Sequence, residues 1–323
     1  MTILVTGATG NIGRHAVRRL VDAGAEVRAL TRRPGSAALP AGVPVAEGDL
    51  ARPSTLPAAF RGVDALLLFP VGETADEVVA LAAEAGVRRI VVLSSAAVTA
   101  GYDTEYHYPV EQAVERSGLA WTHVRPGEFA LNSLQLWGPS VRADRRVVDV
   151  YPDEPATTPV HEADIADVAV AALTEDGHTG RAYSLAGPGT LTHREQVAAI
   201  AAAIGEGIRL DEVTAEEARA FYKRQGGWAG DNADFLFGWE DYSGAALGES
   251  EPESGGDGDG ESGGDGESGG DGDGEGRGRG RGEGGGEQAY EEPDVPWVTA
   301  AEVTGRPARD FAEWARDHAD DFR

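Results

Sequence analysis

A glycine-rich loop near the amino terminus carries the clearest chemical signal in this sequence. Residues Thr6–Gly13 read Thr-Gly-Ala-Thr-Gly-Asn-Ile-Gly and separate a short β-branched run from an amphipathic helical pattern. The three glycines permit a tight turn, a close approach of backbone to a pyrophosphate, and close packing of helix on strand. The following helix offers N–H groups and a positive dipole end to phosphates. This placement favours a dinucleotide site over a tight turn without a ligand. The predicted contact residues are Gly7, Thr9, Gly10, Asn11, Ile12 and Gly13.

The end of the second predicted strand indicates which dinucleotide would bind. An acidic residue about 20 residues after the loop would read the ribose 2′-hydroxyl of NAD. The sequence instead has Leu30-Thr31-Arg32-Arg33 at this place. Guanidinium groups suit a 2′-phosphate, so Arg32 and Arg33 favour NADP(H) over NAD(H). The alternative is that both arginines are ordinary solvated charges of a loop.

The elements that would hold this loop alternate between apolar runs and helical patterns. The predicted strands are Thr2–Thr6, Glu26–Leu30, Val43–Ala46, Ala65–Phe69, Ile90–Ser94 and Thr122–Arg125. The helical patterns between them include Gly13–Ala23, Thr74–Ala85 and Val110–Ser117. Such runs, apolar on both sides and separated by helices, are typical of βαβ units around a sheet buried on both faces. The sequence therefore predicts an α/β fold with a Rossmann-like, doubly wound parallel sheet.

The second half of the chain has a looser pattern, which predicts a smaller carboxy-terminal substrate lobe. Its predicted strands and helices are Val147–Tyr151, Ala182–Leu185, His161–Leu173, Arg194–Ile204, Ala215–Arg224 and Ala308–His318. Capping boxes, in which side chains satisfy the first backbone donors of a helix, are predicted at Thr74–Glu77, Thr192–Glu195 and Thr214–Glu217. We expect residues 1–150 to form the dinucleotide-binding core and residues 151–243 and 289–323 to form the lobe.

An acidic, glycine-rich insertion is expected at residues 244–288. Within it, the 40 residues from Gly248 to Glu287 contain 19 Gly and 13 Asp or Glu, and no apolar side chain. A segment of this composition cannot bury apolar area, so we expect it to be disordered. Its acidic residues do not match the spacing of a calcium-binding loop, and no metal site is predicted.

Composition excludes several classes of partner. The formal net charge is −27, which disfavours nucleic acid and anionic membranes. The chain has no cysteine, and therefore no disulfide or thiolate metal site. It shows neither the pattern of a signal peptide nor a run of about 18 apolar residues. We expect a cytoplasmic monomer or homodimer that acts on a small molecule.

The motifs taken together resemble those of the NmrA-like, atypical short-chain dehydrogenases/reductases. The matching segments are Thr6–Gly13, Gly48–Leu50, Leu93–Ser95, Ser117–Thr122, Arg125–Phe129, Asn132, His161–Ala166 and Thr304–Pro307. The resemblance implies a core that binds NAD(P)(H), with Asp49 and Leu50 near the adenine and Phe69 and Pro70 along the nicotinamide side. It also places Ser94 and Ser95 among the cofactor-binding residues. Family activities include the reduction of quinones, dyes and benzylic ethers, although some members only sense dinucleotides.

The sequence departs from the superfamily at the catalytic pair. A Tyr-x-x-x-Lys pair works because the lysine lowers the pKa of the tyrosine, which then passes a proton to a carbonyl. The only lysine here is Lys223, far from the expected region. His107 is the first candidate for an alternative donor, because imidazole titrates near neutrality. Tyr106 and Tyr108 are the next candidates, and reduction of a quinone or dye needs little acid from the protein.

Two hypotheses follow for the function. The first is an NADP(H)-dependent oxidoreductase that transfers hydride to a small, apolar carbonyl or quinone. The second is a non-catalytic, dinucleotide-sensing regulator that acts through a protein partner. The missing Tyr-Lys pair favours the sensor, whereas the aromatic residues Trp137, Trp228 and Phe235 of the lobe favour the enzyme. A sugar-nucleotide epimerase is disfavoured, because it needs the same missing pair.

Deletion of residues 248–287, with a short Gly-Ser linker in their place, should leave folding and cofactor affinity nearly unchanged. Loop entropy depends only logarithmically on length, by about 0.6 kcal/mol per doubling. Thermal unfolding and NADPH titration of both proteins would measure this. A large loss of melting temperature would show that the segment is a structural element.

Overall fold

The computed structural model describes residues 1–247 and 295–323, and it has an eight-stranded sheet in which every neighbouring pair is parallel. The strand order is β12-β9-β6-β5-β4-β1-β2-β3. The strands are β1 (Thr2–Val5), β2 (Glu26–Thr31), β3 (Val45–Glu47), β4 (Ala65–Leu68), β5 (Arg89–Leu93), β6 (Ala120–Pro126), β9 (Arg181–Ala186) and β12 (Trp297–Thr299). The order reverses between β1 and β4, which is where doubly wound sheets bind ligands. The predicted fold class is confirmed.

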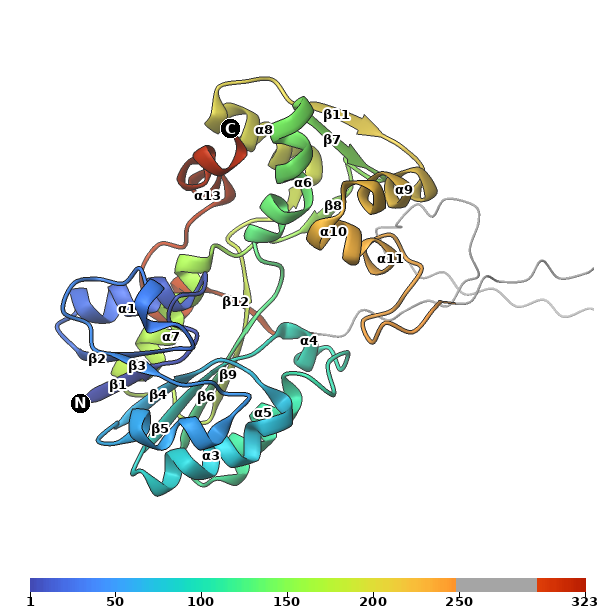
Figure 1. Ribbon diagram of the computed structural model, residues 1–323. Coiled ribbons are helices and arrows are strands. Elements are labelled where there is room, and N and C mark those ends of the chain that lie inside the picture. Colours follow the sequence, from blue (N-terminus) through green and yellow to red (C-terminus); the bar gives the residue numbers. More distant parts are fainter. Residues whose placement is uncertain (248–294) are drawn as a thin grey trace, which may run out of the picture.

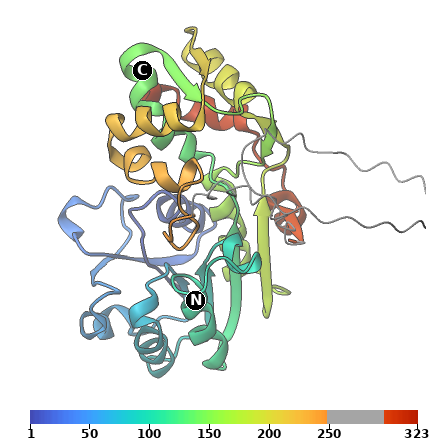
Figure 2. The same ribbon diagram turned by 90° about the vertical axis from the view of Figure 1, so that its right-hand side faces the viewer.

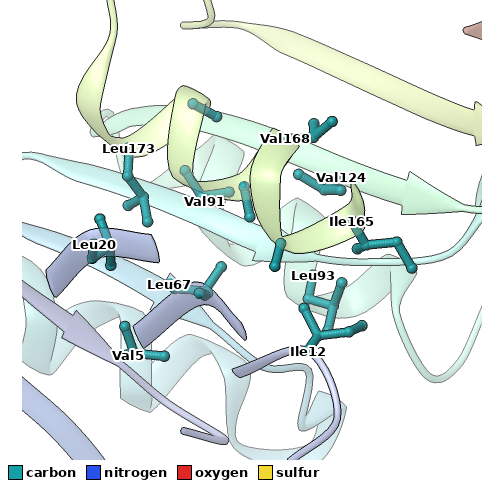
Figure 3. Close-up of a cluster of buried hydrophobic side chains, with 14 of the residues drawn as sticks. Val5, Ile12, Leu20, Leu67, Val91, Leu93, Val124, Ile165, Val168 and Leu173 are labelled. Carbon is teal, nitrogen blue, oxygen red and sulfur yellow. The ribbon is translucent and has the colours of Figure 1, made fainter. Parts of the chain in front are cut away.

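Helices cover both faces of this sheet because each central strand is apolar on both sides. Ile3 and Val5 face one buried cluster with α1 (Gly13–Asp22) and α7 (Glu162–Thr174), whereas Leu4 faces the other. Figure 3 shows the first cluster, in which side chains of α7 lie over β4, β5 and β6. The second face is covered by α2 (Pro57–Phe60), α3 (Ala75–Glu84) and α5 (Tyr108–Arg116). Two further short helices are α4 (Ala96–Thr99) and α12 (Ala300–Thr304).

A second lobe lies beyond the carboxyl ends of the strands (Figure 1) and has its own core. Its helices are α6 (Leu131–Asp144), α8 (His193–Ile204), α9 (Ala215–Gln225), α10 (Gly227–Asp231), α11 (Ala233–Leu236) and α13 (Phe311–Asp317). Its short strands form two pairs, β7 (Arg146–Asp149) with β11 (Arg209–Glu212) and β8 (Pro155–Thr157) with β10 (Leu191–Thr192). The turned view in Figure 2 shows this lobe above one edge of the sheet. Trp137, Tyr222 and Trp314 are among its fully buried side chains.

The chain crosses between core and lobe in places that the sequence pattern did not predict. The segment Ala182–Leu185, expected in the lobe, belongs to β9 and pairs with β6 in the main sheet. The predicted helix at His161–Leu173 is α7 of the sheet layer, whereas α6 before residue 150 belongs to the lobe. The reason is that strand pairing is non-local, so an apolar run does not show which sheet it joins. The predicted insertion at 244–288 lies outside the described residues, apart from its first four positions.

One predicted helix cap is wrong, and two others are confirmed. Thr192 and Thr214 form the expected capping boxes with Glu195 and Glu217. The hydroxyl of Thr74 instead donates to the carbonyl oxygen of Leu50, at 2.8 Å, and does not cap α3. A tertiary acceptor has therefore replaced the local one. Within the described part of the chain, no helix is long and apolar enough to cross a membrane.

Hydrogen bonds to two carboxylates connect the carboxy-terminal segment with the start of α7. The buried carboxylate of Glu162 accepts a hydrogen bond from Nε2 of His318 at 2.7 Å, and Asp164 accepts one from the backbone N–H of Arg309 at 2.8 Å. Burial alone would raise the pKa of Glu162, but the hydrogen bond from His318 and the charge of His161 lower this pKa to about 2. The contact joins the lobe to the core beside the sheet.

Replacing Glu162 by Gln should therefore destabilise the protein above about pH 5, and much less near pH 2. A carboxylate with a lowered pKa stabilises the fold above its unfolded value of 4.5, and this contribution disappears as the pH falls toward 2. The shift corresponds to roughly 3 kcal/mol. Urea unfolding at several pH values would measure it, with Glu84→Gln on an exposed helix face as the control. A loss of stability that stays constant from pH 6 to pH 2 would contradict this assignment.

Candidate functional site

The glycine-rich loop has the geometry of a phosphate cradle. Gly7 adopts a positive φ of 57°, and the backbone N–H of Gly10 donates to the carbonyl oxygen of Gly7 at 2.8 Å. A Cβ on Gly13 would overlap that same carbonyl group, so only glycine fits there. The loop thus brings the amino terminus of α1 against the end of β1. Its residues line a cavity of about 360 Å³, among them Gly7, Gly10, Asn11, Ile12 and Gly13.

A neighbouring cavity of about 350 Å³ begins at the same loop and extends toward the end of β2. Thr9, Arg32, Asp49 and Leu50 are among its lining residues. The guanidinium of Arg32 has no ion pair within the described residues, whereas Asp49 pairs with Arg52 at 3.1 Å. Arg33 does not line this cavity. The 2′-phosphate of an adenosine bound in this cavity would therefore lie nearer to Arg32 than to Arg33.

The other side of the loop cavity has the features expected around a nicotinamide ring. Phe69, Pro70, Leu93 and Ser94 line it, and the ring of Phe69, 44% exposed, lies beside Gly7. The hydroxyl oxygen of Ser94 is buried and has no hydrogen-bond partner among the residues that the structure describes. A buried polar atom without a partner at a cavity wall fits a ligand that supplies the missing hydrogen bond. The glycine cradle and this hydroxyl both fit a dinucleotide.

His107 lines the same cavity and is held by a buried carboxylate. Nδ1 of His107 is hydrogen-bonded to Oδ2 of Asp103, four residues earlier. Oδ1 of Asp103 accepts the backbone N–H groups of Tyr106 and His107, both at 3.0 Å. Burial opposes ionisation, but these hydrogen bonds keep the pKa of Asp103 below its usual value. The imidazole is therefore fixed through Nδ1, and its Nε2 remains available to a ligand.

A tyrosine from the lobe completes this cluster. The hydroxyl of Tyr242 donates to Oδ2 of Asp103 at 3.4 Å. Burial and the nearby Asp103 charge raise the pKa of Tyr242. The contact joins the end of the lobe to the loop between α4 and α5, at the boundary of the two cavities.

A larger cavity of about 840 Å³ lies between the lobes. Aromatic side chains form much of its wall, namely Tyr102, Trp137, Tyr151, Tyr222, Trp228, Phe235, Phe237, Tyr242 and Trp297. Ser95, which also caps α4 by accepting the N–H of Ala97 at 3.2 Å, lies on its core side. Its size and apolar walls are typical of a site for a drug-sized ligand. Among the described residues, no arginine or lysine lines it.

The structure brings most of the predicted site residues together, with three exceptions. Ser95, expected at the dinucleotide, lines the interlobe cavity instead. Tyr106 and His107 line the loop cavity, but Tyr108 begins α5 outside it. Arg33 lies outside the adenosine-side cavity. Two residues of the cluster were missed. The Asp103–His107 spacing of four was visible in the sequence, whereas Tyr242 is 139 residues from Asp103 and no local pattern marks it.

Comparison with known proteins identifies the class to which this chain belongs. A family model described as NAD(P)H-binding matches residues 7–176, more than half of the chain. The chain is 36% identical, over 99% of both proteins, to the (4-alkanoyl-5-oxo-2,5-dihydrofuran-3-yl)methyl phosphate reductase of Streptomyces griseus. It is 33% identical, again over 99% of both, to the NAD(P)H azoreductase of Xenophilus azovorans.

A solved structure agrees with these relatives. The NADPH-dependent quinone oxidoreductase of Escherichia coli, in complex with NADPH, has a TM-score of 0.61 and 26% identity, over 72% of this chain and 86% of that one. The chain therefore belongs to the NAD(P)H-binding family. The resemblance to atypical short-chain dehydrogenases/reductases, the NADP(H) cofactor and the oxidoreductase class are confirmed.

Replacing Arg32 by Ala should weaken NADPH binding by about tenfold or more and leave NADH binding within about twofold. The loss corresponds to one charge-assisted hydrogen-bonding group, which contributes about 1.5–3 kcal/mol. Arg33→Ala is the matched control, and we expect a smaller effect because Arg33 does not line the cavity. Fluorescence titration with both dinucleotides would measure this. Equal affinities of the unmodified protein for NADH and NADPH would contradict the 2′-phosphate assignment.

Proposed function

We propose that this protein is an NADPH-dependent reductase of an uncharged aromatic carbonyl or quinone, with His107 as the proton donor. The observation that carries the proposal is the His107–Asp103 pair, which lines the same cavity as the glycine-rich loop. The proposal assigns to one imidazole the role that a tyrosine and a lysine share in the wider superfamily.

The proposed mechanism divides the work between the two cavities. When bound, the reduced dinucleotide supplies the hydride. The loop residues Gly10, Asn11 and Ile12 would hold its phosphates, and Phe69, which lines the same cavity, would contact its nicotinamide half. Asp103 holds His107 through Nδ1, so Nε2 delivers the proton to the substrate oxygen as negative charge develops there. Tyr242 donates a hydrogen bond to Asp103 from the lobe side and thereby helps to hold the Asp103–His107 pair in place.

The charge of the interlobe cavity supports an uncharged substrate. In the described part of the chain, its carboxyl-bearing lining residues are Glu128, Asp149 and Glu154, and His193 is its one imidazole. A phosphate ester, as in the name of the Streptomyces griseus relative, would find no guanidinium or ammonium group among the described lining residues. The aromatic walls instead favour a flat, apolar body. The full-length reductase relatives support turnover over a sensing role.

His107→Ala should slow the reduction of an aromatic aldehyde by about 10²–10⁴-fold, because it removes general acid catalysis. Reduction of a quinone should slow less, since water can protonate the oxygens of its product. Asp103→Asn should share much of the aldehyde defect, because the imidazole loses its partner. NADPH oxidation with both acceptors would measure these rates.

Two variants serve as controls for this experiment. Tyr108→Phe changes a tyrosine outside the cavity, and Lys223→Ala removes a lysine that pairs with Asp234 in the lobe at 2.7 Å. Both should stay within a few-fold of the unmodified protein. Normal aldehyde reduction by His107→Ala would remove His107 from the mechanism. Tight NADPH binding without turnover of either acceptor would favour the sensor.

A further inference from the structure

A pair of ionisable residues on the lobe side of the interlobe cavity has no part in the proposed hydride and proton transfer. Nδ1 of His193, the first residue of α8, is hydrogen-bonded to Oδ2 of Asp149 at 2.7 Å. Oδ1 of Asp149 accepts the backbone N–H of Val150 at 2.8 Å, so this carboxylate is held at the end of β7. The ring of Trp137 meets His193 edge-on, with the centroids 5.4 Å apart. His193 is therefore fixed, and both residues line the cavity.

Glu128 joins this pair from the core side. It follows the end of β6, and its carbonyl oxygen accepts the backbone N–H of Val160 at 2.8 Å. The pKa of the Glu128 carboxyl is raised because burial outweighs the opposing effects of His193 and of a hydrogen bond with the side chain of Thr157. Burial acts against the charged form of His193 too, but the hydrogen bond to Asp149 raises the pKa of the imidazole. Both side chains line the cavity, and each affects the charge of the other.

The rest of the cavity makes these two donors selective. The described lining residues of the cavity include four carboxyl or imidazole groups, which belong to Glu128, Asp149, Glu154 and His193. The hydroxyl of Ser133, another polar lining residue, already donates to Oε1 of Gln196 at 3.1 Å. A carboxyl group and an imidazole in an aromatic wall can each donate a hydrogen bond to the oxygen of a carbonyl. They do not match an apolar ring edge, because a buried donor without a partner is costly.

We propose that Glu128 and His193 form a second polar subsite, which binds a carbonyl or quinone oxygen at the far end of a multi-ring aromatic acceptor. This inference rests on the proposed function and adds the feature that selects the substrate. The subsite and His107 line different cavities, which adjoin where Ser94 is followed by Ser95. An acceptor that reaches both therefore has more than one ring, with an oxygen on the side away from the nicotinamide.

The subsite can be tested by binding without turnover. The probes are 9-fluorenone and fluorene, two flat three-ring molecules that differ in one carbonyl oxygen. Each is titrated into the protein saturated with NADP⁺, and quenching of the tryptophans in the cavity wall reports binding. We expect fluorenone to bind at least about tenfold more tightly than fluorene, because one satisfied buried hydrogen bond contributes about 1.4 kcal/mol or more.

Matched variants assign this preference to the subsite. Glu128→Leu should reduce it to about threefold or less, whereas Glu128→Gln keeps a neutral N–H donor and should retain most of it. His193→Gln is a second, independent test on the other donor. Glu154→Gln changes the remaining carboxyl of the same wall, and we expect it to behave as the unmodified protein.

Several results would overturn the subsite. These are no preference for fluorenone in the unmodified protein, an unchanged preference in Glu128→Leu and His193→Gln, or a preference lost in His107→Ala instead. The last result would mean that the carbonyl binds beside the cofactor. NADP⁺ affinity, measured first for each variant, separates this outcome from a failure of the proposed function, because loss of dinucleotide binding would count against the latter alone.

Discussion

The contact between the two ends of the glycine-rich loop is the constraint on which the site depends. Gly13 packs so closely on the carbonyl group of Gly7 that no side chain fits between them. This approach sets the start of α1 directly beyond the end of β1, where the strand order of the sheet reverses. The N–H groups of the helix and the open crevice of the sheet thus meet at one point, as phosphate binding requires. The apolar packing of α1 and α7 on the sheet keeps this geometry rigid.

The second lobe covers this crevice and forms one wall of the interlobe cavity. Polar contacts join the lobe to the core at two places. Glu162 contacts His318 beside α7, and Tyr242 contacts Asp103 beside α5. Each contact places a carboxylate of the core against a titratable side chain of the lobe. The interlobe cavity lies next to the second contact. The position of the lobe and the position of the proposed proton donor therefore depend on the same carboxylate, Asp103.

The core and the helices of the lobe could be predicted from the sequence because their signals are local, whereas the contacts between lobe and core could not. The loop and the alternating strands follow from spacing within βαβ units, whereas Asp49, Leu50, Phe69 and Pro70 were expected near the dinucleotide only because of the family resemblance. The predicted cap at Thr74 failed because its hydroxyl donates to the carbonyl oxygen of Leu50, which is distant in sequence, and does not cap α3. β9 joined the main sheet through pairing with β6, a partner set by tertiary packing. Tyr242 and the Glu128–His193–Asp149 group come together only through the way the lobe folds back on the core.

The absence of a tyrosine–lysine pair follows a consistent electrostatic logic. In that pair a cation makes a phenol more acidic, and the positive charge lies next to a dinucleotide that already carries negative phosphates. Here the partner of the candidate donor is an anion, Asp103, which orients the imidazole and does not make it a stronger acid. Such a donor suits acceptors whose reduced oxygen needs little help to become protonated, which describes a quinone better than an isolated ketone. The aromatic walls of the interlobe cavity, and the polar groups across it, favour the same kind of acceptor. The donor and the cavity thus point to one substrate class from independent parts of the chain.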